Sequence, residues 1–172
     1  MKKLLLLFTL SCITLLACKK DDDGTTTNDD QPPAPQTRMD TMTRAGGWVI
    51  TSLTVDPPYN YNGFNISNVY GFLQSCIKDN ILMFKADGVL IGDEGAAKCD
   101  QADPQQATAA WAFTNTQQTE FDLYGSNDVF AFSLSDTTHF TVTELGLTTM
   151  TTINVETVDT TEYTFTTKYK GN

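Results

Sequence analysis

The sequence predicts an all-β domain built from about eight short antiparallel strands. From residue 48 onward, apolar and polar residues alternate with a period of two, the pattern of strands with one buried and one solvated face. Threonine is frequent in these segments, as on the solvated face of antiparallel sheets. The strand segments follow one another without alternating helices, so we expect an antiparallel barrel or sandwich.

The predicted strands begin with residues 48–55, where Val49, Leu53 and Val55 share one face. The next two strands, 81–85 and 89–91, flank Ala86-Asp87-Gly88, a hairpin signal because glycine readily takes a positive φ. The remaining predicted strands cover residues 108–114, 119–124, 129–134, 139–144, 150–158 and 161–169.

One segment breaks the strand pattern. Between the first and second strands, apolar residues recur at helical spacing from Ile66 to Ile77, with Val69, Tyr70 and Leu73 between them. We therefore expect one short helix inserted over residues 66–77.

The N-terminus has the pattern of a secretory signal peptide. Lys2 and Lys3 precede an apolar run that ends before Ala17, and this run is shorter than the ~20 residues of a membrane span. Leu15-Leu16-Ala17-Cys18 resembles the bacterial lipobox, in which the cysteine is acylated and becomes the first mature residue. We expect a lipoprotein signal peptide over residues 1–17 and membrane attachment through lipidated Cys18.

The next segment is predicted to be a tether. Asp, Thr, Pro and Gln dominate residues 18–45, a composition that buries too little apolar surface to fold, which leaves residues 46–172 as a single domain. Lys19-Lys20-Asp21-Asp22-Asp23 is similar to the acidic export signal of surface lipoproteins in one Gram-negative phylum; the alternative is a merely soluble linker. The expected location is the outer membrane, facing either the periplasm or the cell exterior.

The charge excludes two classes of partner. The net charge is −10, and removal of Lys2 and Lys3 makes the mature chain more acidic. Nucleic-acid binding requires a basic surface, and adsorption on anionic lipid requires basic residues as well. Membrane attachment is therefore expected from the acyl chains alone.

Several motifs resemble lipocalins. Gly46-Gly47-Trp48 contains the Gly-x-Trp that opens the first lipocalin strand, and residues 76–88, residues 93–100 and Trp111 look like those of bacterial lipocalin-like lipoproteins. The resemblance covers roughly residues 46–125 in motifs and the rest only in strand pattern. It implies a small up-and-down β-barrel, and most members of the family have no assigned ligand.

The chain departs from the lipocalin pattern at one position. No arginine follows Arg44, so the arginine that usually stacks on the first-strand tryptophan is missing. Lys168 or Lys170 is the available substitute for it.

The two cysteines of the domain, Cys76 and Cys99, are expected to form a disulfide, because an exported protein is in an oxidising compartment. They enclose about 24 residues, for which the chain-entropy account gives roughly 3–3.5 kcal/mol. A reactive thiol pair is the weaker alternative, because the spacing is unlike Cys-x-x-Cys.

Candidate metal ligands are confined to one loop. Asp93, Glu94, Asp100 and Asp103 crowd it, but their spacing matches no calcium loop. We expect a solvated acidic loop, with a metal site as the alternative.

Candidate catalytic residues are few. His139, the one histidine, lies near Ser133, Ser135 and Asp136, but no Gly-x-Ser-x-Gly elbow is present, and we expect a surface histidine. Glycine-rich phosphate loops are also missing from the sequence. We therefore expect no cofactor, no metal and no enzymatic activity; an enzyme that uses dispersed carboxylates is the least favoured alternative.

The aromatic residues divide into two groups. One group surrounds the inserted segment: Tyr59, Tyr61, Phe64, Tyr70 and Phe72. The other lies on strands and is expected to fill most of the core: Trp48, Trp111, Phe121, Phe130, Phe132, Phe140, Tyr163 and Phe165. If one barrel mouth holds a cavity, residues 56–64 would form its rim. The favoured function is binding of a small apolar or amphipathic ligand; the alternative is a protein-interaction or structural module with a filled barrel.

Overall fold

The computed structural model describes residues 36–125 and 137–172. The predicted signal peptide, Cys18, most of the predicted tether and the strand predicted over residues 129–134 lie outside the described residues. Two short helices, a 3₁₀ turn and nine strands are present in the described part: α1 (Arg38–Met42), β1 (Trp48–Tyr61), β2 (Phe64–Asn68), η1 (Tyr70–Phe72), α2 (Ser75–Lys78), β3 (Ile81–Phe84), β4 (Val89–Asp93), β5 (Gln106–Phe113), β6 (Glu120–Tyr124), β7 (Thr137–Leu145), β8 (Thr149–Val158) and β9 (Thr161–Gly171).

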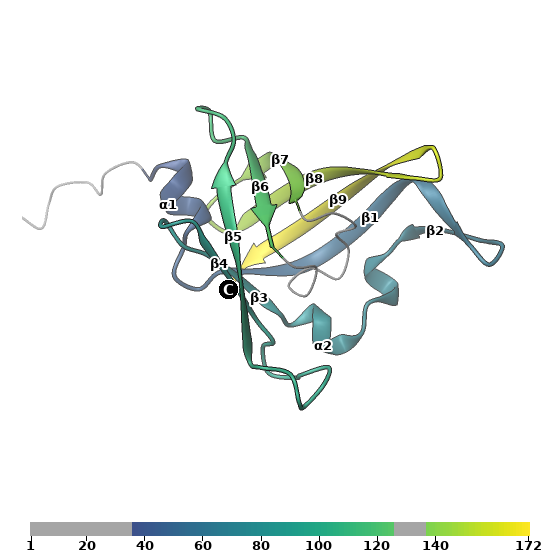
Figure 1. The fold of residues 1–172 in the computed structure, drawn as a ribbon, viewed down its shortest axis with the longest axis horizontal. Helices are drawn as coiled ribbons and strands as arrows, with labels where there is room; N and C mark the ends of the chain where they lie inside the picture. Colours follow the sequence, from purple (N-terminus) through teal and green to yellow (C-terminus); the bar gives the residue numbers. More distant parts are fainter. Residues whose placement is uncertain (1–35, 126–136) are drawn as a thin grey trace, which may run out of the picture. The chain divides into compact units, whose positions relative to one another are not determined.

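Eight of these strands form a closed antiparallel barrel. Each strand from β3 to β8 pairs with the next along the chain, and β1 closes the ring by pairing with both β3 and β9 (Figure 1). Strand β2 is an additional strand that pairs only with β1. The predicted all-β, up-and-down barrel is therefore confirmed.

Three strands are much longer than the others. β1 has 14 residues, β9 has 11 and β8 has 10, whereas β3 has four. In Figure 1 these long strands extend to the right of the shorter ones, and β2 adds to the far part of β1. Pro57 and Pro58 lie where the β1–β2 register shifts, a position that tolerates residues without a backbone donor.

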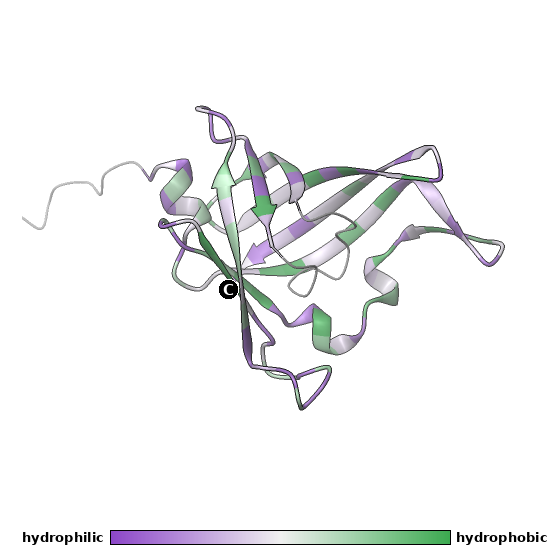
Figure 2. Cartoon of the chain, in the orientation of Figure 1, coloured by the Kyte–Doolittle hydropathy of each residue, from purple (hydrophilic) through white to green (hydrophobic). Residues whose placement is uncertain are grey.

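The barrel has two different ends. We call the end that carries α1 and the turns after β3, β5 and β7 the closed end. We call the opposite end, which carries the segment from β2 to α2, the β4–β5 loop and the β8–β9 turn, the open end. The apolar core lies toward the closed end and consists of Met42, Trp48, Phe84, Leu90, Trp111, Phe121, Leu123, Phe140, Val142, Met150 and Tyr169. In Figure 2, hydrophobic (green) segments alternate with polar ones along several strands of the barrel. Several of its rings meet edge to face, as Phe84 and Trp111 do with centroids 5.0 Å apart.

Helix α1 lies within the segment predicted to be a tether. Thr37 caps it, since the Thr37 hydroxyl accepts from the backbone N–H of Asp40 and the Asp40 carboxylate accepts from that of Thr37. Met42 is fully buried in the core, and its carbonyl accepts a 2.9 Å hydrogen bond from Trp48 Nε1. The folded unit therefore begins before residue 46, earlier than the sequence predicted.

A short helix lies between the first two barrel strands, as the sequence predicted, but it covers less of the chain than residues 66–77. The chain forms β2, then the 3₁₀ turn η1, and only four helical residues in α2. Asn68 Oδ1 accepts a hydrogen bond from the backbone N–H of Gly71, and Leu73 is extended with ψ 140°. Such local side-chain bonds compete with helix formation, and glycine weakens it further.

Arg44 is the cation that stacks on the first-strand tryptophan, Trp48. Its guanidinium carbon lies 5.2 Å from the centre of the Trp48 ring. Lys168 and Lys170, the expected substitutes, are exposed on the outer face of β9. The stacking arginine of this barrel therefore comes before the first strand.

Candidate functional site

The inner wall formed by β8 and β9 changes character from the closed end to the open end. The two strands pair without a register shift, so residues opposite each other share a face. From the closed end outward, the pairs on the inner face are Met150–Tyr169, Thr152–Thr167, Asn154–Phe165 and Glu156–Tyr163. On the other side of β9, β1 contributes Ile50, Leu53 and Val55 to the first three layers.

Hydroxyl groups mark the boundary between the core and the open half. Thr152 and Thr167 are both buried, and their hydroxyls lie beside the buried Tyr169 hydroxyl. The pKa of Tyr169 is raised by burial, which the neighbouring Thr152 and Thr167 hydroxyls only partly oppose.

The outer layers of this wall are polar and aromatic, and half-buried. Asn154 Nδ2 donates to Glu156 Oε1 at 3.3 Å, which shows that both side chains lie on one face of β8. Opposite Glu156, Tyr163 meets the ring of Tyr59 edge to face with centroids 5.5 Å apart. A mixture of apolar surface and a few convergent polar groups is typical of small-molecule sites.

Among residues 36–125 and 137–172, the buried aromatic cluster lies in the closed half. Phe121 stacks on Phe140 with centroids 5.0 Å apart, within the closed-end core. Phe165 lies two layers above Tyr169 and is outside this core cluster of the described residues. Phe130 and Phe132, which the sequence also assigned to the core, lie outside the described residues.

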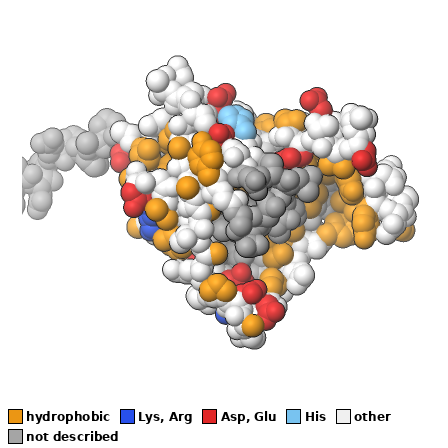
Figure 3. All heavy atoms as spheres, in the orientation of Figure 1, with side chains coloured by type: hydrophobic (Ala, Val, Ile, Leu, Met, Phe, Trp, Pro, Cys, Tyr) orange, Lys and Arg blue, Asp and Glu red, His pale blue; other side chains and the backbone are white. Residues whose placement is uncertain are grey.

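The predicted rim, residues 56–64, is a hairpin rather than a loop. β1 continues to Tyr61, and Asn62 and Gly63 form the turn into β2. Its aromatic side chains are exposed, Tyr61 to 59% and Phe64 to 73%, and Phe72 in η1 is exposed to 72%. Figure 3 shows apolar side chains in this region, at the right of the view.

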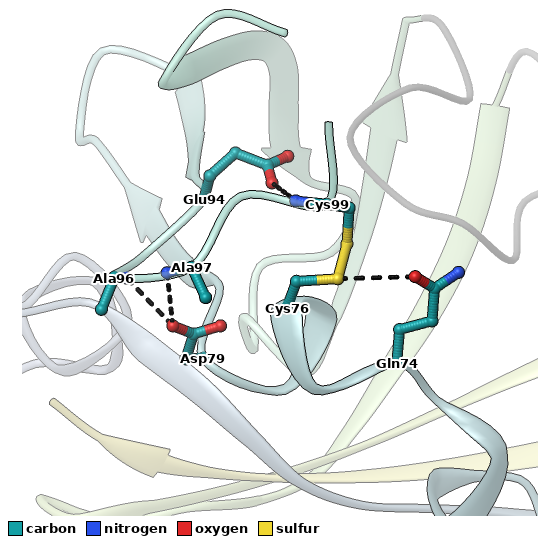
Figure 4. Close-up of a disulfide and its surroundings, with 7 residues drawn as sticks. All are labelled: Gln74, Cys76, Asp79, Glu94, Ala96, Ala97 and Cys99. Carbon is teal, nitrogen blue, oxygen red and sulfur yellow. Dashed lines mark hydrogen bonds between the residues drawn. A yellow bond between two sulfur atoms is a disulfide. The ribbon is translucent and has the colours of Figure 1, made fainter. Parts of the chain in front are cut away.

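The disulfide between Cys76 and Cys99 is present, as the sequence predicted, and joins α2 to the β4–β5 loop (Figure 4). Asp79 reinforces the same connection, because its Oδ2 accepts from the backbone N–H groups of Ala96 and Ala97 at 2.9 and 3.0 Å. Glu94 accepts from the Cys99 backbone N–H at 3.4 Å. These acidic side chains therefore hold the loop in place.

Asp93 has a similar structural role. Its carboxylate accepts hydrogen bonds from Gln106, Gln105 and the backbone of Gly95, and these bonds lower its pKa. A depression of about 360 Å³ lies beside it, lined by residues that include Asn80, Glu94 and Asp103. Within the described ranges no group of three potential ligands is placed to hold a metal ion.

His139 lies on the outer face of the barrel, as expected for a surface histidine, and 53% of its side chain is exposed. Its Nδ1 is 2.6 Å from Asp122 Oδ1, and the Tyr124 hydroxyl donates to Asp122 Oδ2 at 3.2 Å. The pKa of Tyr124 is raised, by desolvation first and then by the Asp122 charge. Ser133, Ser135 and Asp136 lie outside the described residues.

A second depression, of about 450 Å³, lies at the closed end between α1 and the neighbouring turns. Its lining includes Met39, Asp87, Phe113 and Gln118, and Arg38 Nε donates to the Gln118 carbonyl at 2.8 Å beside it. It is open to solvent and outside the barrel, so the inner wall of the open half is the stronger candidate site.

Sequence reasoning missed the polar residues of this inner wall. Thr152, Asn154 and Glu156 occupy alternate positions in a strand that the sequence did predict, but polar residues at such positions are usually assigned to the solvated face.

Comparison with known protein families, curated proteins and solved structures gives no match for this chain.

Proposed function

We propose that this protein is a lipid-anchored, extracytoplasmic, lipocalin-like binding protein that takes a small amphipathic ligand through the open end of its barrel. The observation that carries the proposal is the change along the inner wall. The closed half is a packed aromatic core, whereas the open half carries half-buried Asn154, Glu156, Phe165 and Tyr163. A wall of this composition suits a ligand with an apolar body and a polar group.

The test is a pair of tryptophan substitutions on β8. Asn154→Trp adds bulk to the inner wall, whereas Val155→Trp adds the same bulk one residue away, on the outer face, where Val155 is 56% exposed. We expect an environment-sensitive apolar dye to bind wild type at one saturable site. Asn154→Trp should weaken this binding at least about tenfold, a loss of ~1.4 kcal/mol, and Val155→Trp should leave it unchanged.

Circular dichroism and thermal melting show whether both variants remain folded. Absence of saturable dye binding to wild type would contradict the proposal. Equal loss in the two variants would contradict the assignment of the site to the inner wall.

The second candidate is a protein-interaction module, favoured by the exposed aromatic side chains of Tyr61, Phe64 and Phe72. Tyr61 and Phe64 are opposite each other in the β1–β2 hairpin, and exposed apolar patches mark interaction surfaces on soluble domains. If this is the function, Phe64→Ser with Phe72→Ser should abolish crosslinking of the protein to its neighbours on intact cells, and Asn154→Trp should not. The binding proposal expects the opposite result for dye binding.

The proposed anchor is acylated Cys18, supported by the lipobox-like sequence that precedes it. Among the described residues no helix has the length and apolar content needed to cross a membrane. Cys18→Ser should convert a protein that requires detergent into a soluble or unprocessed one. Wild-type protein that is fully soluble after cell fractionation would contradict the proposed anchor, and with it the proposed outer-membrane or cell-surface location.

A further inference from the structure

Glu156 is an unusual residue for the inner wall of a barrel. It is half-buried near the open end of β8, two layers above the buried side chain of Thr152. In the part of the chain that the structure describes, its one hydrogen bond comes from Asn154, and no lysine, arginine or histidine pairs with it. The wall therefore presents a carboxylate whose charge no described cation balances.

Aromatic rings lie next to this carboxylate. Tyr163 is directly opposite Glu156 on β9, and Tyr59 contacts Tyr163 from β1 at 5.5 Å between ring centres. Aromatic faces attract cations through their quadrupole, and a neighbouring carboxylate adds a full opposite charge. The combination suits an ammonium group, and the Asn154 amide holds the carboxylate in position.

The surroundings also disfavour an anionic ligand. The lysines of β9, Lys168 and Lys170, are exposed and alternate with the inward-facing residues, so they lie on the outer face. The chain as a whole carries a net charge of −10, which attracts cations and repels anions at long range.

Apolar groups lie on the same wall, next to the carboxylate and deeper in the barrel. Phe165 on β9 is opposite Asn154 on β8 and, on its other side, opposite Val55 on β1. Val55 is almost fully buried, and Leu53 lies one layer below it on β1. Four residues of strand separate Glu156 from Thr152, a distance of about 13 Å. This length accommodates a small amphiphile lying along the wall, with its head toward the barrel mouth.

We propose that the ligand is an amphipathic cation: an ammonium group, protonated or quaternary, bound between Glu156 and the Tyr59–Tyr163 pair, with an apolar body along Phe165, Val55 and Leu53. This inference rests on the proposed function, because it names the class of ligand for the same site.

The test compares three probes of equal chain length: octyltrimethylammonium, octanoate and 1-octanol, each below any micelle-forming concentration. The protein is the full chain carrying Cys18→Ser, so that no acyl chain competes, and binding is followed by calorimetry and by tyrosine fluorescence. We expect the cation to bind about tenfold or more tightly than octanoate. Glu156→Gln should weaken cation binding about tenfold and leave 1-octanol binding unchanged.

Glu162→Gln is the matched control. It removes the same charge from the same β8–β9 hairpin, but Glu162 is exposed and lies opposite Thr157, on the outer face. We expect it to change cation binding less than about twofold, since its side chain points away from the site into solvent, where salt screens its charge.

The possible failures are distinguishable. If none of the three probes binds wild type, the proposed function itself fails. If 1-octanol binds at the inner wall but the cation shows no preference over octanoate, the binding function stands and the cationic ligand class is overturned. If Glu162→Gln weakens cation binding as much as Glu156→Gln does, the preference comes from general charge, and the proposed site is overturned.

Discussion

The guanidinium of Arg44 lies over the ring of Trp48, 5.2 Å from its centre, and holds together three separate parts of the closed end. Its Nη1 donates to the carbonyl of Leu147, in the turn between β7 and β8, at 2.6 Å. Its Nη2 donates to the carbonyl of Asn172 at the C-terminus at 3.2 Å. One side chain thus connects the segment before β1, a hairpin turn and the end of β9.

Loss of this arginine should therefore destabilise the whole barrel. We expect Arg44→Ala to lower the free energy of unfolding by about 2–3 kcal/mol, because charged hydrogen bonds and the cation–π contact are lost together. Arg44→Lys should give an intermediate loss, since lysine keeps the charge without the planar fork. Urea unfolding measures the free energy of unfolding of the two Arg44 variants, and Lys168→Ala, at an exposed position, is the control. A loss below ~0.5 kcal/mol for Arg44→Ala would refute the connecting role of Arg44.

The Cys76–Cys99 disulfide should contribute stability without being required for folding. The bonded residues are 23 positions apart, and a loop of this size corresponds to roughly 3 kcal/mol. The hydrogen bonds from Ala96 and Ala97 to Asp79 join the same segments independently of it. Reduction should therefore lower the melting temperature by several degrees, and so should Cys76→Ser with Cys99→Ser.

The double variant also provides the control for reduction, because reductant should not change its melting temperature. Two freely alkylatable thiols in the native oxidised protein would contradict the disulfide. A melting temperature that reduction leaves unchanged would contradict its contribution to stability.

The strand pattern could be predicted from the sequence because each strand of a barrel buries alternate residues. Phe121 and Leu123 on β6 and Phe140 and Val142 on β7 are such residues, and all four are buried in the core. Closure of the barrel depends instead on the pairing of β1 with β9, which are far apart in the sequence. Strand alternation alone does not reveal such a pairing, and here the resemblance to lipocalins supplied the expectation.

The differences between the sequence prediction and the structure have a common physical cause: the local pattern of apolar residues does not determine tertiary contacts. Met42 was assigned to the tether by composition, yet it is buried because α1 folds onto the closed end. The helix expected over residues 66–77 is present only as the short α2, and the chain around Asn68 and Gly71 is extended or 3₁₀. Glu156 lies on an inner face, where the sequence pattern alone would place an apolar side chain.

Stability should depend on the ionisation of Asp93. Hydrogen bonds from Gln106, Gln105 and the Gly95 backbone lower its pKa below the ordinary value of 3.8. A carboxyl whose pKa is lowered by folding contributes stability above its unfolded pKa, and this contribution is lost as the pH falls through the folded value. The melting difference between wild type and Asp93→Asn should therefore be constant above about pH 5 and decrease below about pH 4.

Asp159→Asn is the control for Asp93→Asn, because it also removes one carboxylate charge but lies in the exposed β8–β9 turn. Its melting difference from wild type should change little over this range. A difference for Asp93→Asn that grows on acidification would have the wrong sign and would contradict the assigned role.

Gly95 and Gly63 both have a positive φ, +68° and +85°, but their surroundings differ. A Cβ at Gly95 would overlap the backbone carbonyl of Asp79, next to the disulfide, whereas a Cβ at Gly63 meets no atom within 4 Å. Gly63→Ala should lower the free energy of unfolding by only ~1 kcal/mol, from backbone strain. Gly95→Ala should lower it by ~2 kcal/mol or more, because the β4–β5 loop must also move away from α2.

Hydrogen exchange locates the effect of the Gly95 change. The backbone amides of Ala96 and Ala97, which donate to Asp79, should exchange faster in Gly95→Ala and at the wild-type rate in Gly63→Ala. Equal destabilisation by the two substitutions would show that backbone strain alone accounts for Gly95. Unchanged exchange at Ala96 and Ala97 would show that the loop does not depend on close approach to Asp79.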